Sequence, residues 1–394
     1  MNVTSSNNTY YIEGKIDSSN AQAFETQLLT TPAGAVTIDA EHLEYISSAG
    51  LRVLMKLRKS HPEGVTVLNV SPAVYDIFEM TGFTDILDVK KQLRQISIDG
   101  CELIGRGGNG SVYRISEDEI IKVYTLNISM ESIERERMLA RNAFIAGVPT
   151  AIPYDVVKVG EHYGIVFEMV KADVVGKRLL SAPERFDEYA VKYADLFKQI
   201  HRVKLSGKGL PATNDIYLNY ADQLFGWYKA EEIDRLKWFI GQIPERETMV
   251  HGDFHTNNIM VQETELLIID MAEISYGHPI YDLASSYYAH VLNPRQDPDS
   301  VMKYLNVTPE IAMRLWDVMM HRYFETDDPQ KIAQYNAVIE GFCLLKAAIT
   351  PAVWANMSDA RKKHSVDSAK QYLFPRMEEL LEALRDMASS FPHN

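Results

Sequence analysis

The stretch that most constrains this chain is MVHGDFHTNNIM, at residues 249–260. It holds two histidines, an aspartate and two asparagines between β-prone segments, and the next β-prone segment ends at Asp270. Asn258 follows Asp253 by five residues, and Asp270 follows Asn258 by twelve. A polar turn between two strands would not require these intervals, so we expect a loop whose side chains carry chemistry.

A zinc site is one alternative, because His251 and His255 are four residues apart, like a helical pair of zinc ligands. However, Gly252 and the β-prone flanks argue against a helix here, and the HExxH glutamate is missing. We therefore expect both histidines to support the loop rather than to bind metal.

A glycine-rich segment lies far upstream, where residues 102–124 read ELIGRGGNGSVYRISEDEIIKVY. A lone G-x-G-x-x-G pattern also occurs in dinucleotide-binding folds and in ordinary turns. Here the pattern is followed by a β-prone run, a tight turn and a second β-prone run that carries Lys122. This order favours a loop over nucleotide phosphates, with Lys122 as the cation on the α- and β-phosphates. The residues expected to line the nucleotide in this loop are Gly105, Gly107, Gly110 and Val112.

The next helix, expected over residues 129–146, should supply a carboxylate that holds the lysine. It offers Glu134 and Glu136. Glu136 shares a helix face with apolar residues three and four positions away, whereas Glu134 lies with Arg141. We therefore predict that Glu136 points toward the sheet and pairs with Lys122.

The apolar stretch YGIVFEMV, residues 163–170, is predicted to form a buried strand. Its end, from Glu168 to Val170, is our candidate for the hinge whose backbone would pair with a purine base. The same composition is typical of any core strand, so this prediction depends on the neighbouring motifs.

Together these residues fit phosphoryl transfer to a hydroxyl group. Asp253 would orient the acceptor hydroxyl and take its proton. The Asn258 amide oxygen and the Asp270 carboxylate are hard ligands suited to Mg²⁺, which would bridge the phosphates of ATP or GTP.

Residues 100 to about 290 resemble the aminoglycoside phosphotransferase and choline kinase-like group of the protein-kinase fold, whose catalytic loop commonly reads HGDxHxxN. His255, where protein kinases usually carry a lysine, favours the small-molecule branch, as does GHPIYDLA at residues 277–284. The resemblance implies that Asp282 fixes the catalytic loop. Neither a DFG sequence nor an APE segment accompanies Asp270, so control by activation-loop phosphorylation is not expected.

Residues 5–90 carry a second resemblance, to the STAS domain of anti-sigma-factor antagonists. The segments that carry it are GKIDSSNAQAFE (14–25), IDAEHLEYISSAGLRVLMKL (38–57) and NVSPAVYDIFEMTGFTDIL (69–87). In such regulators a partner kinase phosphorylates a serine directly before a glycine at a helix start. Here Ala49 precedes Gly50, so Ser47 and Ser48 are expected to cap the helix, with phosphorylation of Ser48 as the alternative.

We therefore predict an α/β plus α+β protein. Residues 1–94 would form a STAS-type sheet with helices, and residues 95–394 a bilobal kinase-like fold. The N-lobe would cover about 95–170 and the mostly helical C-lobe about 171–394, with the join in a short polar stretch.

Composition indicates which binding partners and which cellular compartment to expect. The net charge is −14 and no Lys/Arg-rich block stands out, which disfavours nucleic acid and anionic membranes and would attract a cationic small molecule. Two distant cysteines cannot form a disulfide framework, and neither a signal peptide nor an 18-residue apolar run is found. We expect a cytoplasmic protein.

Our first hypothesis is a kinase of a small hydroxylated molecule, such as an aminoglycoside, an amino alcohol or a sugar, with a STAS module that regulates it or docks a protein partner. A second is a protein kinase or regulator that acts on STAS or anti-sigma partners. A third is a binding module that only senses nucleotide. Every catalytic position is filled, which favours an active enzyme over the third.

Overall fold

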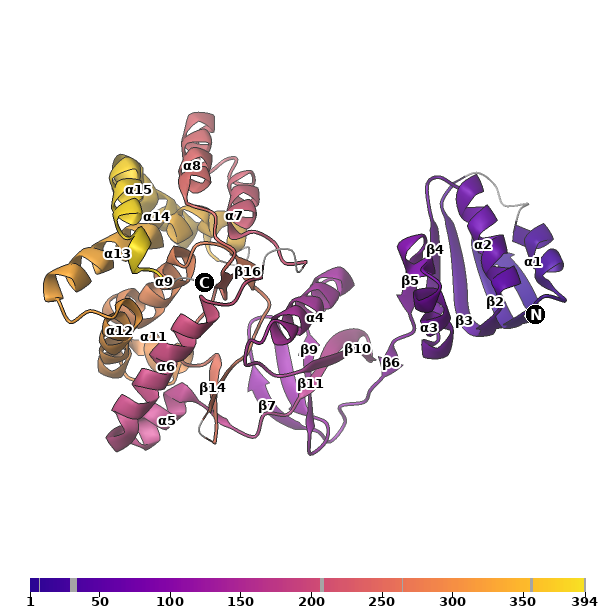
Figure 1. The fold of residues 1–394 in the computed structure, drawn as a ribbon, viewed down its shortest axis with the longest axis horizontal. Coiled ribbons are helices and arrows are strands. Elements are labelled where there is room, and N and C mark those ends of the chain that lie inside the picture. The colour runs from indigo at the N-terminus through magenta and orange to yellow at the C-terminus, as the bar shows by residue number, and fades with distance from the viewer. Residues whose placement is uncertain (7, 29–33, 206–208, 264, 355–356, 393–394) are drawn as a thin grey trace. The chain divides into compact units, whose positions relative to one another are not determined.

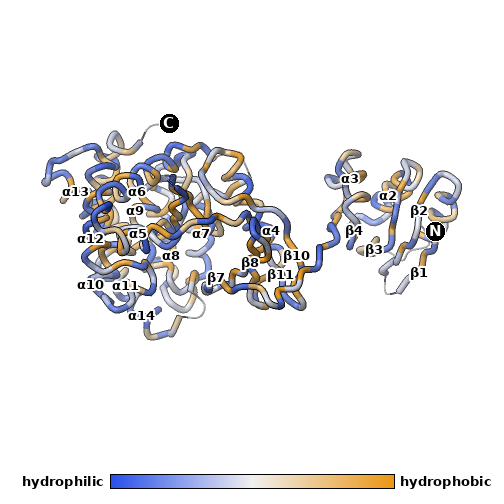
Figure 2. Tube along the Cα trace, turned by 90° about the horizontal axis from the view of Figure 1, so that it is seen from below, coloured by the Kyte–Doolittle hydropathy of each residue, from blue (hydrophilic) through white to orange (hydrophobic). Residues whose placement is uncertain are grey.

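The computed structural model describes residues 1–6, 8–28, 34–205, 209–263, 265–354 and 357–392. The chain divides into two compact units, shown in Figure 1. The first comprises Met1–Ser97 with Val157–Gly160, and the second comprises Ile98–Val156 with Glu161–Asn394. Apolar residues recur in short runs along the helices and strands of each unit (Figure 2). This patterning lets each element bury one face.

In the first unit, strands and helices alternate. Its elements are β1 (Asn2–Ser6), β2 (Thr9–Ile16), α1 (Ala21–Leu28), β3 (Val36–Ile46), α2 (Ser48–Ser60), β4 (Val65–Val70), α3 (Pro72–Met80), the 3₁₀ segment η1 (Phe83–Asp85) and β5 (Asp88–Lys91). The sheet order is β1-β2-β3-β4-β5, with β1 antiparallel to β2 and the other neighbours parallel. Each parallel step is connected by a helix, which is the connection that parallel strands require.

Helix α2 begins at Ser48. Ser47 alone is the N-cap, and its Oγ accepts the Gly50 N–H at 3.4 Å, so the capping prediction is confirmed for Ser47 and is wrong for Ser48. A Cβ on Gly50 would lie 2.6 Å from Ile16 Cγ2 and 2.8 Å from Ile46 Cγ1. Glycine therefore lets the helix start lie close to the sheet.

The second unit starts with a β-rich part. Its elements are β7 (Glu102–Arg106), β8 (Gly110–Arg114), β9 (Glu119–Tyr124), α4 (Met130–Ile145), β10 (Pro153–Val159, whose end from Val157 belongs to the first unit) and β11 (His162–Glu168). The short strand β6 (Arg94–Gln95) belongs to the first unit and pairs with Val157 and Lys158 of β10. The sheet order is β6-β10-β11-β9-β8-β7. The predicted helix over 129–146 is α4, with Ser129 as its N-cap.

A helical part follows, and two small sheets with the orders β12-β14-β15 and β13-β16 carry its loops. Its helices and strands are β12 (Asp173–Val174), α5 (Val175–Ser181), α6 (Phe186–Ile200), α7 (Thr213–Ala221), α8 (Ala230–Gln242), β13 (Met249–Val250), β14 (Ile259–Gln262), β15 (Glu265–Ile268), β16 (Ser275–Tyr276), α9 (Ile280–Tyr287), α10 (Asn293–Gln296), α11 (Pro298–Leu305), α12 (Pro309–Phe324), α13 (Pro329–Val353), α14 (Asp359–Ser368) and α15 (Met377–Asp386). Short 3₁₀ and π segments are η2 (Pro183–Arg185), η3 (Tyr288–Leu292), η4 (Ala369–Leu373), η5 (Phe374–Arg376) and η6 (Ala388–Ser390).

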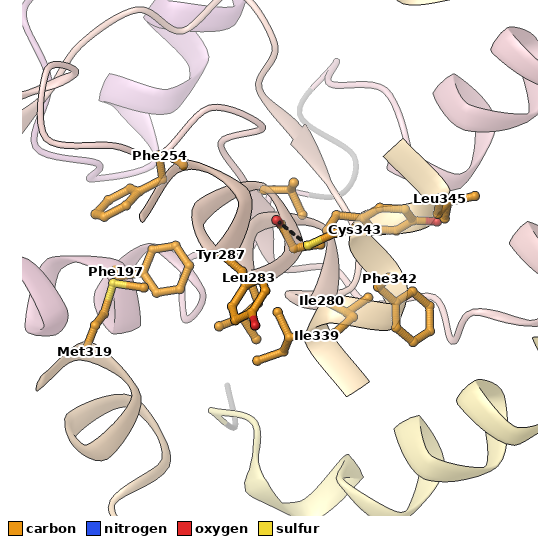
Figure 3. Packing of buried hydrophobic residues seen from close by; sticks show 14 of the residues in the cluster. Phe197, Phe254, Ile280, Leu283, Tyr287, Met319, Ile339, Phe342, Cys343 and Leu345 are labelled. Carbon is orange, nitrogen blue, oxygen red and sulfur yellow. Dashed lines mark hydrogen bonds between the residues drawn. The ribbon is translucent and has the colours of Figure 1, made fainter. Parts of the chain in front are cut away.

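The core of this part packs α9 and α13 together and reaches the 249–260 loop (Figure 3). Phe254, in the middle of that loop, is 1% exposed and packs on Tyr193 and Phe197 of α6, with ring centroids 4.8 and 4.6 Å away. Cys343 of α13 donates its thiol to the Ala284 carbonyl at 3.1 Å. The loop is therefore anchored in the core by its own aromatic residue.

Helix α13 is long and apolar enough, by length and composition, to cross a membrane. Half of its most apolar window is buried inside the protein, however, and its side chains belong to the core shown in Figure 3. A core helix of a globular domain passes the same test, so this is weak evidence for a membrane span.

Candidate active site

The glycine-rich turn connects β7 to β8, and its glycines differ in the space around them. A Cβ on Gly107 would meet nothing within 4 Å, so this part of the turn is open to a ligand. A Cβ on Gly110 would lie 2.2 Å from the Val123 carbonyl oxygen, so Gly110 is required by the packing of β8 on β9. Gly105 and Val112 face each other across the β7–β8 pair. Close approach to a phosphate therefore concerns Gly107 most directly.

Lys122 of β9 is held by two carboxylates. Its Nζ lies 2.8 Å from Glu136 Oε1 and 3.0 Å from Asp270 Oδ1. Glu134 instead pairs with Arg137 on its own helix. Burial lowers the pKa of Lys122, but the Asp270 and Glu136 carboxylates outweigh burial and raise the pKa above its usual value. The ammonium therefore stays charged, and Glu136 is the glutamate placed against it.

The candidate hinge is partly engaged within the chain. The Glu168 N–H donates to the Ile152 carbonyl at 3.0 Å, and Glu168 Oε2 accepts the Ile152 N–H at 3.4 Å. The Val170 carbonyl accepts the Ala172 N–H at 2.9 Å. The Glu168 side chain and the Val170 carbonyl thus have intramolecular partners, and pairing of this backbone with a base stays a prediction.

Asp282, at the start of α9, fixes the beginning of the 249–260 loop. Its Oδ2 accepts the His251 N–H at 2.7 Å, and its Oδ1 accepts the Gly252 N–H at 2.6 Å. His201 Nε2 of α6 lies 3.1 Å from Oδ2. Burial raises the pKa of Asp282, but His201 and the His251 N–H outweigh it and lower the pKa. Asp282 therefore holds the loop as a buried anion, in the role that the resemblance implies.

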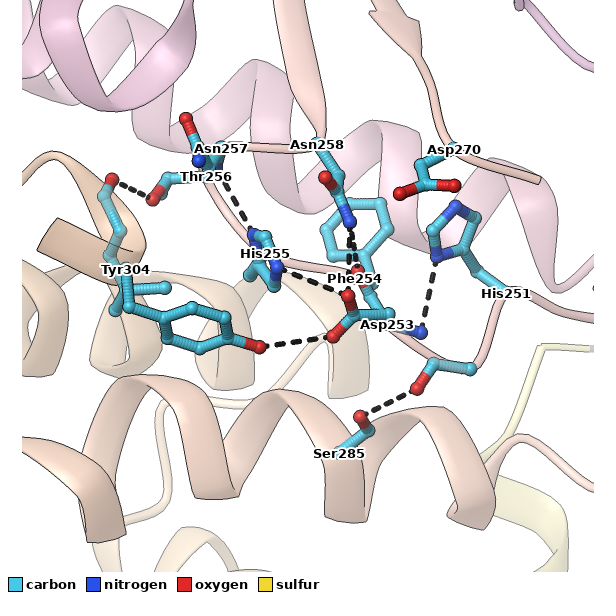
Figure 4. Close-up of polar contacts among 12 residues, drawn as sticks. His251, Asp253, Phe254, His255, Thr256, Asn257, Asn258, Asp270, Ser285 and Tyr304 are labelled. Carbon is cyan, nitrogen blue, oxygen red and sulfur yellow. Dashed lines mark hydrogen bonds and ion pairs between the residues drawn. The ribbon is translucent and has the colours of Figure 1, made fainter. Parts of the chain in front are cut away.

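The two loop histidines are fixed by hydrogen bonds from the backbone (Figure 4). His251 Nδ1 accepts the Asp253 N–H at 3.2 Å, so its Nε2 carries the proton and donates to the Ile269 carbonyl at 3.2 Å. His255 Nδ1 accepts the Asn257 N–H at 3.3 Å, so its Nε2–H faces Asp253. No group of three His, Cys, Asp or Glu able to hold a metal ion occurs in the described part of the chain. Both histidines support the loop.

Asp253 accepts hydrogen bonds on both oxygens (Figure 4). Its Oδ2 lies 3.2 Å from His255 Nε2 and 3.3 Å from Asn258 Nδ2. Its Oδ1 accepts the Tyr304 hydroxyl at 3.1 Å. Burial raises the pKa of Asp253, but His255 and the nearby Lys346 outweigh burial and lower the pKa. The side chain keeps 40% of its surface exposed, so an ionised carboxylate is accessible to a ligand.

Asn258 and Asp270 lie on neighbouring strand ends, because the Ile269 N–H donates to the Asn258 carbonyl at 2.8 Å. The Asn258 amide nitrogen is directed to Asp253, which leaves its side-chain oxygen as an acceptor. Asp270 has a left-handed backbone, with φ of 64°, a conformation uncommon for a non-glycine residue. One amide and one carboxylate oxygen fit Mg²⁺, which keeps several waters and phosphate oxygens in its shell.

Two charged residues beside the loop were missed in the sequence. Lys346 of α13 donates to the Gly252 carbonyl at 3.0 Å and to Ser285 Oγ at 2.6 Å. Glu273 is an exposed residue, but burial of its carboxyl group, together with the negative charges of Asp253, Asp270 and Asp282, raises its pKa. Lys346 opposes that rise. No motif spacing in the sequence links these two residues to Asp253. Lys346 reaches the loop only because α13 packs beside it in the folded chain.

A charged lysine held by a glutamate under a glycine turn, with an ionised aspartate on a separate loop, defines a phosphotransferase of the kinase type. Residues 100–320 match the Phosphotransferase enzyme family, and residues 1–96 match the STAS domain. Because the first match spans more than half of the chain, the chain belongs to the phosphotransferase enzyme family. It is an enzyme that transfers phosphate to hydroxyl groups, and the predicted resemblances and fold class are confirmed.

One curated protein and two solved structures illustrate the similarity to known proteins. The first unit is 36% identical, over 84 residues, to BtrV of Bordetella bronchiseptica, which is named an anti-sigma factor antagonist. This match covers 20% of the chain and 72% of BtrV. A choline/ethanolamine kinase family protein from Mesorhizobium loti is 16% identical, with a TM-score of 0.46, over 73% of this chain and 92% of its own. The streptomycin-ATP-APH(2")-IIa ternary complex is 14% identical, with a TM-score of 0.45, over 70% and 92%.

Proposed function

We propose that the second unit transfers the γ-phosphate of ATP or GTP to a hydroxyl of a small molecule of the aminoglycoside, amino alcohol or sugar type. The observation that carries this proposal is the Asp253 carboxylate. It is ionised and accessible, and it lies on the same loop as Asn258. A carboxylate held in this way can accept the hydrogen bond of an incoming hydroxyl.

The nucleotide would bind between the glycine turn and the catalytic loop. Lys122 would supply a positive charge to the α- and β-phosphates, supported by the Glu136 carboxylate 2.8 Å away. Its contact with Asp270 would give way to the phosphates. Asn258 and Asp270 would hold Mg²⁺, which when bound neutralises the phosphate charge.

The reaction would proceed by direct displacement. The acceptor oxygen forms a bond to the γ-phosphorus, the bond from this phosphorus to the β-γ bridging oxygen breaks, and the diphosphate leaves. The proton of the acceptor hydroxyl passes to Asp253. Asp282 and Lys346 do not touch the reacting atoms in this scheme, and they hold the Gly252 backbone that positions Asp253.

The charges of the site support a neutral or cationic acceptor. Asp253 and Asp270 lie close enough to Glu273 for their charges to raise its pKa, and Lys346 opposes only part of that rise. An anionic acceptor would be repelled at this loop, while an amine would be attracted. The net charge of −14 acts in the same direction at longer range.

The test is a transfer assay with the full chain, Mg²⁺, and ATP or GTP against a panel of aminoglycosides, amino alcohols and sugars. We expect a phosphate monoester, identified by ³¹P NMR and mass spectrometry, from at least one acceptor. Lys122→Met is the negative control and should abolish the product. If no acceptor is phosphorylated with either nucleotide, the proposal is wrong.

For the first unit we propose a docking or regulatory role toward a protein partner. Ser48 is exposed at the start of α2, while Ala49, directly before Gly50, has no hydroxyl to phosphorylate. Docking would therefore not depend on a phosphoserine at that position. Mass spectrometry after incubation with ATP tests this directly: a phosphate on Ser48 would instead favour a phosphorylation switch.

A further inference from the structure

Tyr304 is the one residue from outside the catalytic loop that donates to Asp253 in the described part of the chain, and its position is built by several contacts. It lies in the last turn of α11, where Thr256 Oγ1 donates to the Leu305 carbonyl at 2.5 Å. Asn306 Nδ2 donates to Asn257 Oδ1 at 2.6 Å. The end of α11 is thus attached to the loop at the two residues that follow Tyr304.

The ring of Tyr304 packs edge-on against the His255 ring, with centroids 4.6 Å apart, and its hydroxyl points at Asp253 (Figure 4). Tyr304 still exposes 36% of its surface, so a ligand can reach it. This combination of a fixed backbone, a packed ring and a partly exposed side chain is what a specificity residue requires.

Counting hydrogen-bond capacity shows where an acceptor can bind. Oδ2 of Asp253 accepts from Asn258 and lies 3.2 Å from His255 Nε2, so two groups already occupy the space around this oxygen. Oδ1 accepts only from Tyr304 among these groups, so one lone pair remains for the acceptor hydroxyl. Oδ1 is therefore the less crowded oxygen, and a hydroxyl bound there lies next to the Tyr304 hydroxyl.

The Tyr304 hydroxyl is itself left as an acceptor. Its one hydrogen is directed to Asp253 Oδ1, so only oxygen lone pairs face a ligand. Tyr304 Oη and Asp253 Oδ1 are 3.1 Å apart, and each can accept a hydrogen bond from a ligand. A ligand with one donor and a neighbouring methyl or ether group would leave the tyrosine oxygen unpaired, which costs affinity.

We propose that Tyr304 is a specificity-determining residue that, together with Asp253, selects acceptors carrying a second O–H or N–H donor on the carbon next to the phosphorylated hydroxyl. Such acceptors are 1,2-diols and 1,2-amino alcohols with a free N–H. The inference rests on the proposed function, because it assumes that Asp253 receives the reacting hydroxyl.

The experiment compares matched acceptors with two variants of the full chain. Each acceptor from the panel is paired with its analogue in which the neighbouring donor is replaced by hydrogen, and kcat/KM is measured for both. Wild type should prefer the donor-bearing acceptor by about tenfold, as expected for one hydrogen bond. Tyr304→Phe should reduce this ratio to near one, mainly through KM of the donor-bearing acceptor. Any general loss of rate cancels in the ratio.

Tyr372→Phe is the matched control, because Tyr372 is an exposed tyrosine of the η4 segment, and it should keep the wild-type ratio. An unchanged ratio in Tyr304→Phe, with transfer intact, overturns this inference alone. An equal increase in kcat/KM for both acceptors in Tyr304→Phe would mean that Tyr304 only blocks the site. That result also contradicts this inference. Absence of transfer to every acceptor contradicts the proposed function itself, and this inference with it.

Discussion

Single residues of the catalytic loop work through the groups that hold them. Asp253 is oriented by His255, Asn258 and Tyr304, and its backbone N–H is held by His251. The loop start in turn depends on the two N–H groups that Asp282 accepts. Removing a buried acceptor from donors that stay buried costs more than the bond itself contributes.

Asp282→Asn tests this dependence. The substitution removes a buried anion and replaces one acceptor oxygen by an amide that cannot accept the Gly252 or His251 N–H. We expect the free energy of unfolding to fall by about 2–4 kcal/mol and transfer activity to fall strongly. Urea unfolding and the transfer assay measure both.

Asp317→Asn is the matched control, since Asp317 is 70% exposed on α12 and contacts only His321 in the ion pairs described. It should change stability by less than about 0.5 kcal/mol. Equal stability of the two variants would mean that Asp282 does not anchor the loop.

Some of these site residues could be predicted from the sequence, and others could not, for a physical reason. Glu136 could be separated from Glu134 because helix periodicity decides which one faces the sheet. Lys122, Asp253, Asn258 and Asp270 follow from spacing within strands and loops, and the structure brings them together. Tyr304 lies 51 residues after Asp253, and Lys346 lies 94 residues after Gly252, so only tertiary packing reveals them.

At the scale of elements, α5 and α11 together position Tyr304. A Cβ on Gly176 of α5 would lie 2.2 Å from the Leu305 carbonyl oxygen at the end of α11. The Gly176 N–H also points to the Thr256 carbonyl, at 3.4 Å. The glycine thus allows α5, α11 and the catalytic loop to meet at one place.

Gly176→Ala should therefore push the end of α11 away without changing any polar side chain of the site. We expect a loss of about 1–3 kcal/mol in the free energy of unfolding. The preference for donor-bearing acceptors should weaken, because Tyr304 moves with Leu305. Differential scanning fluorimetry and the acceptor-pair assay report the two effects.

Gly241→Ala serves as the control for this pair. A Cβ on Gly241 of α8 would meet nothing within 4 Å, so alanine should be neutral or stabilise by up to about 1 kcal/mol. If Gly176→Ala behaved like Gly241→Ala, the contact between α5 and α11 would not matter for the site.

Most elements could be predicted from their residue patterns. The 163–170 strand is β11 (His162–Glu168), and the 129–146 helix is α4 with its serine cap. The π segments η3 and η4 and the short α10 were not predicted. They continue α9 and α14 or connect them to the next helix, and their local sequences carry no signal that distinguishes them from ordinary helix.

At the scale of the whole molecule, the second unit buries histidines that titrate in an accessible pH range. Burial lowers the pKa of His290 to about 4 and that of His278 to about 3, from a usual value of 6.5. The unfolded chain therefore binds protons below pH 6.5 that the folded chain does not bind until pH 4 or lower. Stability is largest above pH 6.5 and falls as the pH decreases.

We expect the free energy of unfolding to decrease between pH 6.5 and 4 by about 1.4 kcal/mol per pH unit for each of these histidines. Denaturant unfolding of the full chain at several pH values measures the slope. His290→Gln should lower the slope of the unfolding free energy against pH by about 1.4 kcal/mol per pH unit, the contribution of one histidine. His364→Gln, at an exposed position, should leave this slope unchanged. A slope unaffected by His290→Gln would contradict burial of a neutral histidine.

The most direct test of the account is single-turnover transfer of the γ-phosphate from ATP to an acceptor by wild type and Asp253→Asn, with nucleotide affinity measured in parallel. We predict that Asp253→Asn binds nucleotide with wild-type affinity and forms the phosphate ester about 10²–10⁴ times more slowly. Ester formation at the wild-type rate by Asp253→Asn would contradict the role of Asp253. Another group at this site would then have to accept the proton of the acceptor hydroxyl.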